Sequence, residues 1–422
     1  MEVRYDMLVN GKLTRGSRTL DVVDPATAEV FAACACASRE EIEDAVTASA
    51  AAFPTWSATS LDERRAVLIK MAEAIETNLE SIARTLTSEQ GKPIGDAQGE
   101  VGGAAYFLRY YAGLEIPVEM IEDSEARRIE LHRRPLGVVA AIVPWNFPVL
   151  TAVNKVGAAL ITGNTVVVKP AATTPLATLQ VAALWRDIVP AGVANIVTDK
   201  NDLGDVLTSH PLVRKVSFTG STETGKRFLR YSADSNLKKV VLECGGKNPA
   251  VVLDDAENLD SVAGHIVNAA FWNMGENCSA TSRLIVQSGV KSALMERIIA
   301  RTREMRVGDP LDPTNHLGAL IDAEHCAKVA GYLKGTALVG GKADGPFVQP
   351  SIYEVKAGDA KATDEIFGPI LSVFEVASYD EAIAVANDTP YGLAAAVFTA
   401  NGRRGIRAAR DIKAGTVTVN CY

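Results

Sequence analysis

The fold of this chain is decided at residues 137–169, GVVAAIVPWNFPVLTAVNKVGAALITGNTVVVK. Two runs of small and β-branched apolar residues flank a segment whose apolar residues repeat at helical spacing. Strands that are apolar on both faces and divided by a helix are typical of a parallel sheet covered on each side. The stretch therefore predicts a strand–helix–strand unit.

The same alternation of apolar runs and helical segments continues to residue 245. Beyond the first unit we predict a helix at 176–185 and strands at 195–197, 216–218 and 239–243. A second series begins at AVVLDD (250–255) and ends at TVTVN (416–420). The sequence therefore predicts an α/β fold with a doubly wound parallel sheet and a second α/β domain.

Helices are predicted to precede this sheet. Two S-x-x-E capping boxes, at 38–41 and at 60–63, stand before periodic apolar residues. From the second box the apolar pattern continues to position 86 and stops at Gly91 and Pro93. We therefore predict one long amphipathic helix after the second box.

Length and charge limit the classes of partner. The chain has 422 residues, more than one ordinary hydrophobic core accommodates, so two or three domains are expected. It carries 43 lysines and arginines against 51 aspartates and glutamates, a net charge of −8. No basic run is long enough to follow a phosphate backbone. We therefore expect neither nucleic acid nor an anionic membrane as a partner.

Hydropathy and cysteine usage predict a cytoplasmic protein. No apolar run approaches the roughly 20 residues that span a bilayer, and the N-terminus lacks a basic start followed by an apolar stretch. The six cysteines are scattered along the chain, as in a reducing compartment. Cys34 and Cys36 form a C-x-C pair without a second pair or nearby histidines, so we predict no metal site.

Four polar stretches interrupt the apolar pattern, and two of them suit ligand binding. PWNFP (144–148) follows a predicted strand, and ligands bind at the carboxyl ends of parallel strands, although Asn146 can equally close an Asx turn. FTGSTETG (218–225) combines glycines with a helix start that can hold an anion. An ordinary strand-to-helix turn has the same sequence, so neither signal is specific alone.

The other two stretches contain reactive groups. In VLECGGKNP (241–249), Glu243 ends a predicted strand, so we expect a partly buried carboxylate whose pKa is raised toward that of a base. A capping or ion-paired glutamate is the alternative. In FWNMGENCSATSR (271–283), Cys278 lies among small and polar residues, where a thiolate nucleophile can form. The alternative is an inert cysteine.

Taken together, six motifs resemble those of the aldehyde dehydrogenase superfamily. In order they are PWNFP, GNTVVVKP (163–170), FTGSTETG, LECGGKNP, GENC (275–278) and EIFGP (365–369). They span nearly the whole chain at family-like separations, which makes the match highly specific. The resemblance implies an NAD(P)-dependent enzyme that oxidises a small-molecule aldehyde to a carboxylic acid.

The resemblance also implies four catalytic residues. Cys278 would attack the aldehyde to form a thiohemiacetal, whose oxyanion the Asn146 side-chain amide and the Cys278 backbone N–H would hold. Hydride transfer to the nicotinamide would leave a thioester, and Glu243 would activate the water that hydrolyses it. Lys155 would lie near this base.

Contacts to NAD or NADP follow from the same resemblance. They are Val143, Pro144, Trp145, Lys169, Ala172, Gly220, Ser221, Gly225, Cys244, Glu365 and Phe367, with Glu365 on the nicotinamide ribose. Family members that prefer NAD commonly carry a glutamate at the position of Ala172, where it repels a 2′-phosphate. Alanine removes this repulsion, so we expect NADP to be accepted, with Lys169 as a partner for its phosphate.

The resemblance implies a division of labour along the chain. Residues 1–116 and 136–245 would form the NAD(P)-binding domain, 117–135 the oligomerisation strands and 246–422 the catalytic domain. The chain ends at TVTVNCY, where family members continue with a substrate-lining loop and a strand that pairs with a neighbouring subunit. We therefore expect a homo-oligomer weakened at this interface.

Two other functions remain open, and the aldehyde is undetermined. A CoA-acylating relative would transfer the acyl group to CoA instead of water, which the presence of Glu243 argues against. A catalytically impaired cofactor-binding or scaffold relative would follow from the short C-terminus, which the intact motifs argue against. A mixed apolar substrate tunnel is expected to be lined by Phe147, Val149, Val153 and Asn154.

Overall fold

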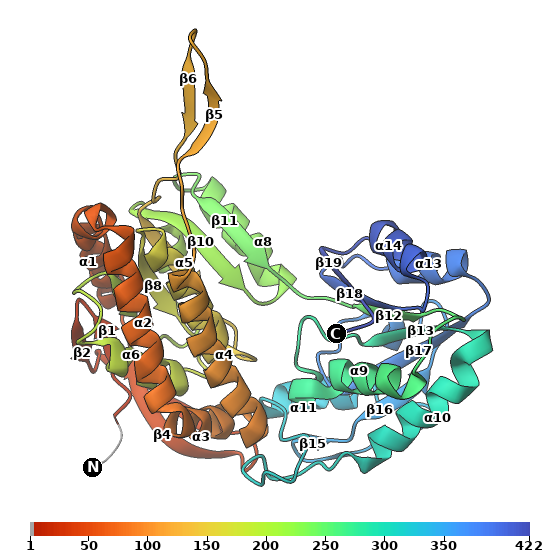
Figure 1. Ribbon diagram of the computed structural model, residues 1–422. Coiled ribbons are helices and arrows are strands. Elements are labelled where there is room, and N and C mark those ends of the chain that lie inside the picture. The colour runs from red at the N-terminus through yellow and green to blue at the C-terminus, as the bar shows by residue number, and fades with distance from the viewer. Residues whose placement is uncertain (1–3) are drawn as a thin grey trace. The chain divides into compact units, whose positions relative to one another are not determined.

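The computed structural model describes residues 4–422, which divide into two compact units (Figure 1). Unit 1 contains the described residues up to Val23, together with Val30–Glu89 and Ala97–Glu243. Unit 2 contains Asp24–Glu29, Gln90–Asp96 and Cys244–Tyr422. No helix within residues 4–422 combines the length and apolarity needed to cross a membrane.

Unit 1 is built around a seven-stranded sheet. In spatial order its strands are β11 (Lys239–Glu243), β10 (Val213–Thr219), β7 (Val138–Ile142), β8 (Thr165–Lys169), β9 (Ala194–Ile196), β1 (Met7–Val9) and β2 (Lys12–Thr14). Neighbouring strands from β11 to β9 are parallel, and β1 and β2 join the edge antiparallel. The chain runs from β7 outward through β8 and β9 and then returns to β10 and β11. This reversal makes the sheet doubly wound, as predicted.

Helices cover both faces of this sheet. They are α1 (Arg39–Ala58), α2 (Leu61–Thr77), α3 (Leu79–Gln90), α4 (Ile94–Ala112), α5 (Pro148–Ile161), α6 (Leu176–Trp185), α7 (Gly204–Ser209) and α8 (Thr222–Ala233). On one face α5 and α6 pack together with α2, and on the other α7 and α8 pack together with α1 at one end. Every residue of β7 and β8 is buried, as expected for apolar strands between two layers of helices.

The early helices begin where predicted, but one of them is shorter. Ser38 with Glu41 and Ser60 with Glu63 both form complete capping boxes. The prediction of one long helix after Ser60 is wrong, because α2 ends and α3 begins on either side of Asn78. The Asn78 side chain donates a 2.8 Å hydrogen bond to a carbonyl in the preceding turn. Asparagine competes in this way with the helical backbone and so favours helix ends.

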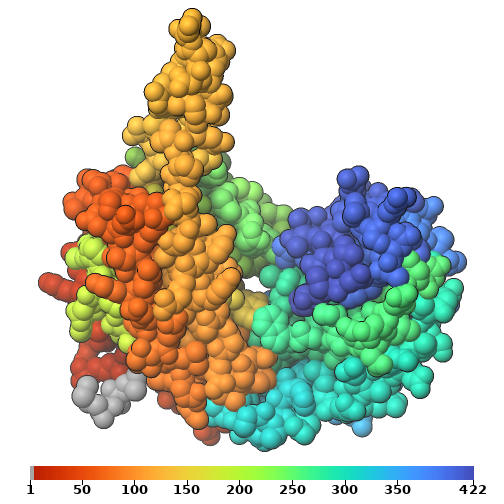
Figure 2. Space-filling view, viewed as in Figure 1, coloured from red at the N-terminus to blue at the C-terminus, as the bar shows by residue number. Residues whose placement is uncertain are grey.

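Two small two-stranded sheets complete unit 1. One pairs β3 (Arg18–Asp24) with β4 (Glu29–Cys36), and the other pairs β5 (Glu119–Asp123) antiparallel with β6 (Arg128–Leu131). Figure 2 shows the β5–β6 hairpin standing clear of the rest of unit 1, and every residue of β6 is exposed. These strands lie within the segment 117–135, whose role in assembly stays a prediction.

Unit 2 contains a six-stranded sheet in which all neighbouring strands are parallel. In spatial order the strands are β16 (Ser351–Glu354), β17 (Ile370–Val376), β13 (Arg283–Gln287), β12 (Pro249–Val252), β18 (Ala394–Phe398) and β19 (Thr416–Val419). A separate pair is formed by β14 (Ala343–Asp344) and β15 (Phe347–Val348). The second α/β series is therefore confirmed.

Alternate residues of these strands form two cores, one on each face of the sheet. On one face Ala250 and Leu284 pack with α9 (Leu259–Phe271) and α10 (Ser288–Glu304). On the other, Val251 and Ile285 pack with α13 (Tyr379–Asn387) and α14 (Gly402–Asp411). The shorter helices are η1 (Trp272–Gly275), α11 (Ala323–Ala330) and α12 (Ala360–Thr363). Because strand side chains alternate, the four central strands β17, β13, β12 and β18 contribute to both cores.

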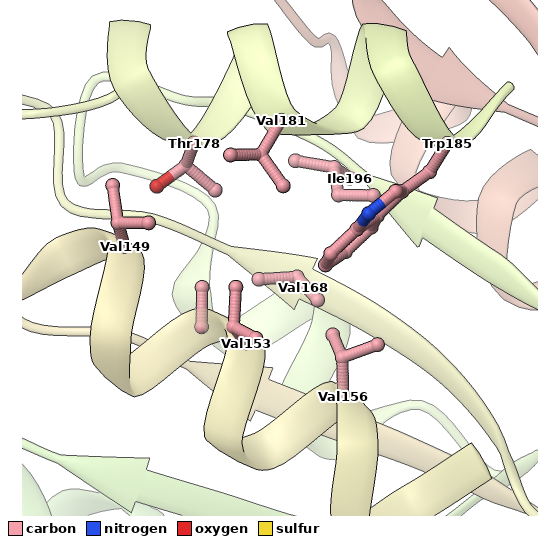
Figure 3. Close-up of a pocket in the computed structure, with 9 residues that line it drawn as sticks. Val149, Val153, Val156, Val168, Thr178, Val181, Trp185 and Ile196 are labelled. Carbon is pink, nitrogen blue, oxygen red and sulfur yellow. The ribbon is translucent and has the colours of Figure 1, made fainter. Parts of the chain in front are cut away.

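A small apolar cavity lies in unit 1 between α5, α6, β8 and β9 (Figure 3). Val149 and Val153 line it together with Val168, Val181 and Trp185. Both α5 residues are almost fully buried, at 0% and 1% exposure. The expectation that Val149 and Val153 line a substrate tunnel is therefore wrong, because the face of α5 that carries them packs against the sheet and α6.

Candidate active site

The candidate residues of unit 1 lie along one edge of its sheet. The strand register pairs Glu243 with Thr219, and it pairs Ile142 with Phe218 on one side and Lys169 on the other. Since the strands are parallel, their carboxyl ends share this edge, which is where doubly wound sheets bind ligands. The structure thus brings together the ends of β11, β10, β7 and β8.

Asn146 is held in the loop between β7 and α5. Asn146 is buried, with only 5% of its surface exposed. The Val143 N–H donates to the Lys169 carbonyl at 3.0 Å, which ties the start of the loop to β8. At the other end α5 begins after Phe147, whose side chain provides no cap.

A buried carboxylate from α4 caps α5 instead. Glu100, 3% exposed, accepts hydrogen bonds from the Val149 and Leu150 N–H groups at 2.9 and 3.1 Å. A carboxylate at a helix N-terminus satisfies free N–H groups and interacts favourably with the helix dipole. Glu100 therefore fixes the helix start that follows Asn146. Glu100 was not predicted to lie here, because no sequence signal links α4 to the start of α5.

Lys155 and Glu243 both belong to unit 1, where Lys155 lies on α5 and Glu243 is the last residue of β11. The Lys155 ammonium donates to the Ser217 hydroxyl at 3.1 Å. Burial lowers the pKa of Lys155 to about 8, an effect that the nearby charge of Glu243 opposes and Lys215 reinforces. Glu243 itself is exposed in this structure. Our expectation of a partly buried carboxylate is therefore wrong, since β11 is the edge strand of the sheet.

Lys169 forms an ion pair that the sequence did not indicate. Its ammonium lies 2.6 Å from an Asp199 carboxylate oxygen, and the two side chains are 6% and 0% exposed. It also donates to the Asn201 side-chain carbonyl at 3.3 Å. The side chain predicted to contact the cofactor phosphate is therefore already bonded to a carboxylate. Asp199 follows β9 in a polar loop, which in sequence looks like an ordinary connection.

Ala172 lies between Lys169 and the start of α6, and it is partly buried. The start of α6 is capped by Glu89, which accepts from the Leu176 and Ala177 N–H groups at 2.6 and 2.9 Å. Burial raises the pKa of Glu89 to about 8, although these N–H groups act in the opposite direction. Glu89 and Glu100 thus cap the two helices that follow the candidate loops.

The turn from β10 into α8 has little room for side chains. A Cβ on Gly220 would lie 2.7 Å from the Phe218 ring, so the backbone stays bare at this point. The Ser221 hydroxyl caps α8 by accepting from the Thr224 N–H at 3.3 Å. Gly225, in the first turn of α8, is buried. The predicted residues therefore form a tight turn at the start of α8, in which the Gly220 N–H donates to the Glu243 carbonyl at 3.0 Å.

In unit 2 the candidate residues lie at the amino ends of the strands. Cys278 is partly exposed and precedes β13, and Asn248 directly precedes β12. The Asn248 side-chain amide donates to the Cys278 carbonyl at 2.8 Å and to the Ala280 carbonyl at 2.9 Å. Its oxygen accepts from the Ala394 N–H at 3.0 Å. Asn248 therefore fixes the backbone of the cysteine loop against two strands.

The buried Glu276 carboxylate anchors the same loop. Glu276 is 0% exposed and accepts from the Gln90 side-chain amide at 2.8 Å and from the Ile321 N–H at 3.0 Å. Burial raises the pKa of Glu276 well above its usual value, while the charge of Lys92 acts in the opposite direction. The sequence around Glu276 does not indicate this anchoring role. Its anchoring partners lie far away in the sequence.

Polar side chains also flank Cys278 directly. The Asn277 side-chain oxygen accepts from both the N–H and the hydroxyl of Ser279, each at 3.0 Å. The Asn277 amide donates to the Tyr422 hydroxyl at 3.2 Å. With Asn248 and Glu276, these bonds hold the loop on three sides, which suits a nucleophile that needs a fixed direction of attack.

Glu365 faces the glycine turn that precedes β12. Its carboxylate accepts from the Gly246 N–H at 2.9 Å, and a Cβ on Gly245 would lie 2.0 Å from it. Burial raises the pKa of Glu365, and the Gly246 N–H opposes the shift. Phe367 adopts a left-handed conformation at φ 60°, and its carbonyl lies 2.7 Å from His325 Nε2. Gly245 thus makes room for the carboxylate, and Gly246 donates a hydrogen bond to it.

The unit 1 residues by themselves fit part of a nicotinamide dinucleotide, since they supply a cation at Lys169 and the bare Gly220 turn at a helix start. Of the other predicted contacts, Val143 is buried, whereas Pro144, Trp145 and Cys244 are partly exposed. Within residues 4–422 no group of three histidine, cysteine, aspartate or glutamate side chains is placed to hold a metal ion.

Comparison with known proteins identifies the family of the chain. The aldehyde dehydrogenase family model matches residues 13–422. An aminoacetaldehyde dehydrogenase of Pseudomonas aeruginosa is 47% identical, over 96% of this chain and 85% of its own length.

Two solved structures are similar over the whole chain. The γ-glutamyl-γ-aminobutyraldehyde dehydrogenase of Burkholderia cenocepacia is 39% identical with a TM-score of 0.97, and the match covers 100% of this chain and 89% of that one. A P. syringae indole-3-acetaldehyde dehydrogenase, a cysteine-to-alanine mutant in complex with NAD+ and IAA, is 36% identical with a TM-score of 0.96, covering 100% and 90%. The chain belongs to the aldehyde dehydrogenase family, as its motifs predict.

Proposed function

We propose that this protein oxidises an aldehyde to a carboxylic acid with Cys278 as the nucleophile. The observation that carries the proposal is the anchoring of the cysteine loop by Asn248 and Glu276, which keeps a partly exposed thiol in one orientation. The thiolate adds to the aldehyde carbon and gives a thiohemiacetal. The Asn146 side-chain amide and the Cys278 N–H stabilise the negative oxygen that develops.

A nicotinamide dinucleotide supplies the hydride acceptor when it is bound. Lys169, Gly220, Ser221 and Gly225 are the unit 1 residues proposed to hold it, and Glu365 contributes from unit 2. Both NAD and NADP fit this proposal, because Ala172 lacks the carboxylate that would repel a 2′-phosphate. The P. syringae relative was solved with NAD+.

Glu243 is proposed to activate the water that releases the acid. Its exposed position at the end of β11 leaves its carboxylate accessible to water. Lys155 lies close enough for its charge to interact with Glu243, and its lowered pKa of about 8 allows it to exchange a proton near neutral pH. Water rather than CoA is therefore the expected acyl acceptor.

Relatives suggest which aldehydes to assay first. By name, the relatives above act on aminoacetaldehyde, on γ-glutamyl-γ-aminobutyraldehyde and on indole-3-acetaldehyde. We therefore propose a small amino aldehyde as the first substrate, with an aromatic aldehyde and a semialdehyde for comparison.

The test is a turnover assay that follows absorbance of the reduced cofactor and identifies the product by mass spectrometry. Free acid and reduced cofactor in equal amounts are expected with at least one of these aldehydes. Acyl-CoA formed on addition of CoA would support a CoA-acylating enzyme. Cofactor binding without turnover on any aldehyde would support a scaffold role.

Assembly and location complete the proposal. The β5–β6 hairpin exposes several large apolar residues, namely Val118, Met120, Ile121 and Leu131, at 43–60% exposure. An exposed apolar strand pair is suited to pairing with another copy of the chain. We therefore propose a homo-oligomer, to be tested by light scattering with Ile121→Lys as the interface variant. All six cysteines are free, which favours a reducing compartment such as the cytoplasm.

A further inference from the structure

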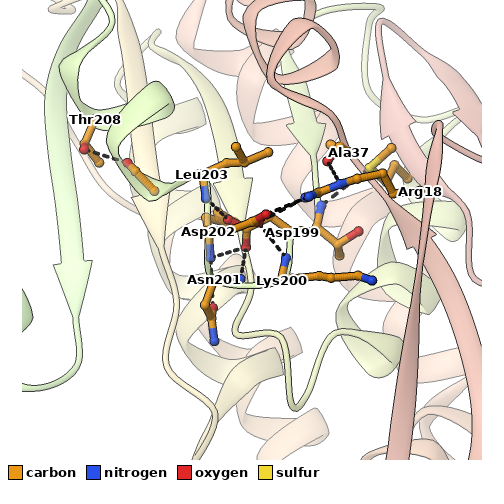
Figure 4. A network of polar contacts seen from close by, with 12 residues as sticks. Arg18, Ala37, Asp199, Lys200, Asn201, Asp202, Leu203 and Thr208 are labelled. Carbon is orange, nitrogen blue, oxygen red and sulfur yellow. Dashed lines mark hydrogen bonds and ion pairs between the residues drawn. The ribbon is translucent and has the colours of Figure 1, made fainter.

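The loop after β9 brings a cluster of acidic and amide side chains to the carboxyl edge of the unit 1 sheet (Figure 4). Asp199 and Asp202 are its two carboxylates, and they differ in environment. Asp202 is exposed and paired with Arg18 at 2.6 Å. Asp199 is fully buried and paired with Lys169. Substitutions of Asp199 and Asp202 can therefore be compared to separate the effect of a buried carboxylate from that of an exposed one.

Asp199 is held rigidly in place. One of its carboxylate oxygens accepts from the Asn201 N–H at 3.1 Å, and the other accepts from the Leu203 N–H at 2.9 Å. The first oxygen also lies 2.6 Å from the Lys169 ammonium. A carboxylate with this many donors stays in position when a ligand binds nearby, because moving it would break all of these bonds.

Lys169 lies at the strand end where dinucleotide-binding folds contact the adenosine ribose. It is the last residue of β8, the second strand of the strand–helix–strand unit. In dinucleotide-binding folds, an acidic side chain within such a unit contacts the ribose 2′-OH and selects against NADP. The corresponding strand here ends in a lysine, and the carboxylate that neutralises it comes from the next strand, β9.

We propose that Asp199 is a specificity-determining residue that limits the binding of NADP relative to NAD. The proposal rests on the proposed function, which places Lys169 at the adenosine ribose. A 2′-phosphate beside Lys169 would meet the Asp199 carboxylate, and like charges at short range repel strongly when they are shielded from water. In addition, the Lys169 charge is already bonded to Asp199 and cannot be given fully to the phosphate.

Ala172 and Asp199 therefore act in opposite directions. Alanine at 172 removes one source of repulsion toward a 2′-phosphate. Asp199 supplies another from a neighbouring strand, at a place that a comparison of motifs around Lys169 does not reach. The preference of the protein for one cofactor is then a balance that a single substitution at 199 can shift.

Asp199→Asn tests the proposal, because asparagine keeps the shape and an acceptor oxygen but removes the charge. Binding of AMP, adenosine 2′,5′-bisphosphate, NAD and NADP is measured by isothermal titration calorimetry, without any aldehyde. The ratio of bisphosphate to AMP affinity is expected to rise about tenfold or more in Asp199→Asn. Asp202→Asn, which removes a carboxylate of the same loop, should leave the ratio within about twofold.

A second variant tests whether the effect of Asp199 on phosphate binding depends on the charge of Lys169. In Asp199→Asn combined with Lys169→Met, the gain for the bisphosphate should be smaller than in Asp199→Asn alone, because the direct repulsion is still removed but the freed ammonium is no longer there. Asp199→Ser replaces Asp199→Asn if the latter fails to fold, and NAD affinity checks that each variant retains its site.

The outcomes separate this proposal from the proposed function. An unchanged affinity ratio in a folded Asp199 variant that still binds NAD and turns over aldehyde would overturn the proposal and leave the function intact. An equal rise in Asp202→Asn would also overturn it, because net charge would then be the cause. If the wild-type protein binds neither NAD nor NADP, both the proposal and the function fall.

Discussion

The side-chain amide of Asn248 donates a 2.8 Å hydrogen bond to the backbone carbonyl of Cys278. This bond joins the glycine-rich turn that follows Glu243 to the loop of the proposed nucleophile. A Cβ on Gly246, in the same turn, would lie 2.5 Å from that carbonyl, so the contact requires glycine there. Two of the sequence motifs are therefore parts of one packed arrangement.

Asn248→Ala is expected to lower kcat about tenfold or more with a smaller effect on KM, because the cysteine loop loses its fixed orientation. The substitution also removes three hydrogen bonds to backbone groups, one of them buried, and should lower the free energy of unfolding by about 2–4 kcal/mol. Steady-state kinetics and the rate of Cys278 alkylation by iodoacetamide measure the change at the site.

The matched control for this variant is Asn236→Ala. Asn236 also donates its amide to two backbone carbonyls, at 2.9 and 3.0 Å, but it lies in unit 1 away from the candidate residues. It should lose stability and keep its kcat. If both variants lose kcat equally, Asn248 acts through stability alone.

Cys278→Ser should reduce turnover at least about a thousandfold, since a hydroxyl is a far weaker nucleophile at neutral pH. Affinity for NAD should stay nearly unchanged, because the thiol is not a cofactor contact. Kinetics with calorimetry of NAD binding measure both effects, and Cys421→Ser, at an exposed thiol, is the control. Near wild-type turnover in Cys278→Ser would remove this residue from the mechanism.

Glu243→Gln should produce a burst of about one reduced cofactor per subunit, followed by a stall. Acylation of the cysteine does not need the carboxylate, whereas hydrolysis of the thioester does. Stopped-flow absorbance resolves the burst, and Glu296→Gln, at an exposed position on α10, should behave as wild type. Steady turnover without a burst would place the base elsewhere.

Much of the fold could be predicted because its signals are local. The strands β7, β8 and β11 are short apolar runs bounded by glycines or charges, and the periods of α5 and α6 are helical along their length. The capping boxes also act within four residues. By contrast, the break at Asn78 depends on one side chain interrupting an otherwise continuous pattern, which the apolar period does not record.

The candidate site was predicted only where residue type itself carries the chemistry. Cys278 and Glu243 are of this kind, whereas Asn248, Glu276 and Asp199 act through partners 30 to 186 residues away in the sequence. Such pairings arise from the packing of distant strands and helices. Periodicity and spacing do not report them, so these groups became visible only in the structure.

Stability should depend on pH through Glu89. Its pKa is about 8 in the folded protein and about 4.3 in an unfolded chain, so the folded state holds one more proton between these values. The contribution of Glu89 to the free energy of unfolding is therefore largest below pH 4.3. It falls as the pH rises toward 8, by at most about 1.4 kcal/mol per pH unit.

Glu89→Gln should remove this slope, since an amide does not titrate. The free energy of unfolding of the full-length protein, measured with urea at pH 5.5, 6.5, 7.5 and 8.5, reports the effect. Glu80→Gln, at an exposed position on α3, is the control. A wild-type slope that persists in Glu89→Gln would assign the pH dependence to another group.

Ala172→Glu should shift the cofactor preference toward NAD. A glutamate at 172 would add a carboxylate beside Lys169, where it can accept hydrogen bonds from the ribose hydroxyls and repel a 2′-phosphate. We expect kcat/KM for NADP to fall about tenfold or more relative to that for NAD. Ala171→Glu, one residue earlier, controls for the added charge, and both cofactors are assayed at the same ionic strength because the repulsion is screened by salt. Since Asp199 already restrains NADP in our proposal, Ala172→Glu should have its largest effect in the Asp199→Asn background. A strong NAD preference in the wild type that Ala172→Glu leaves unchanged would show that position 172 does not contribute to cofactor choice.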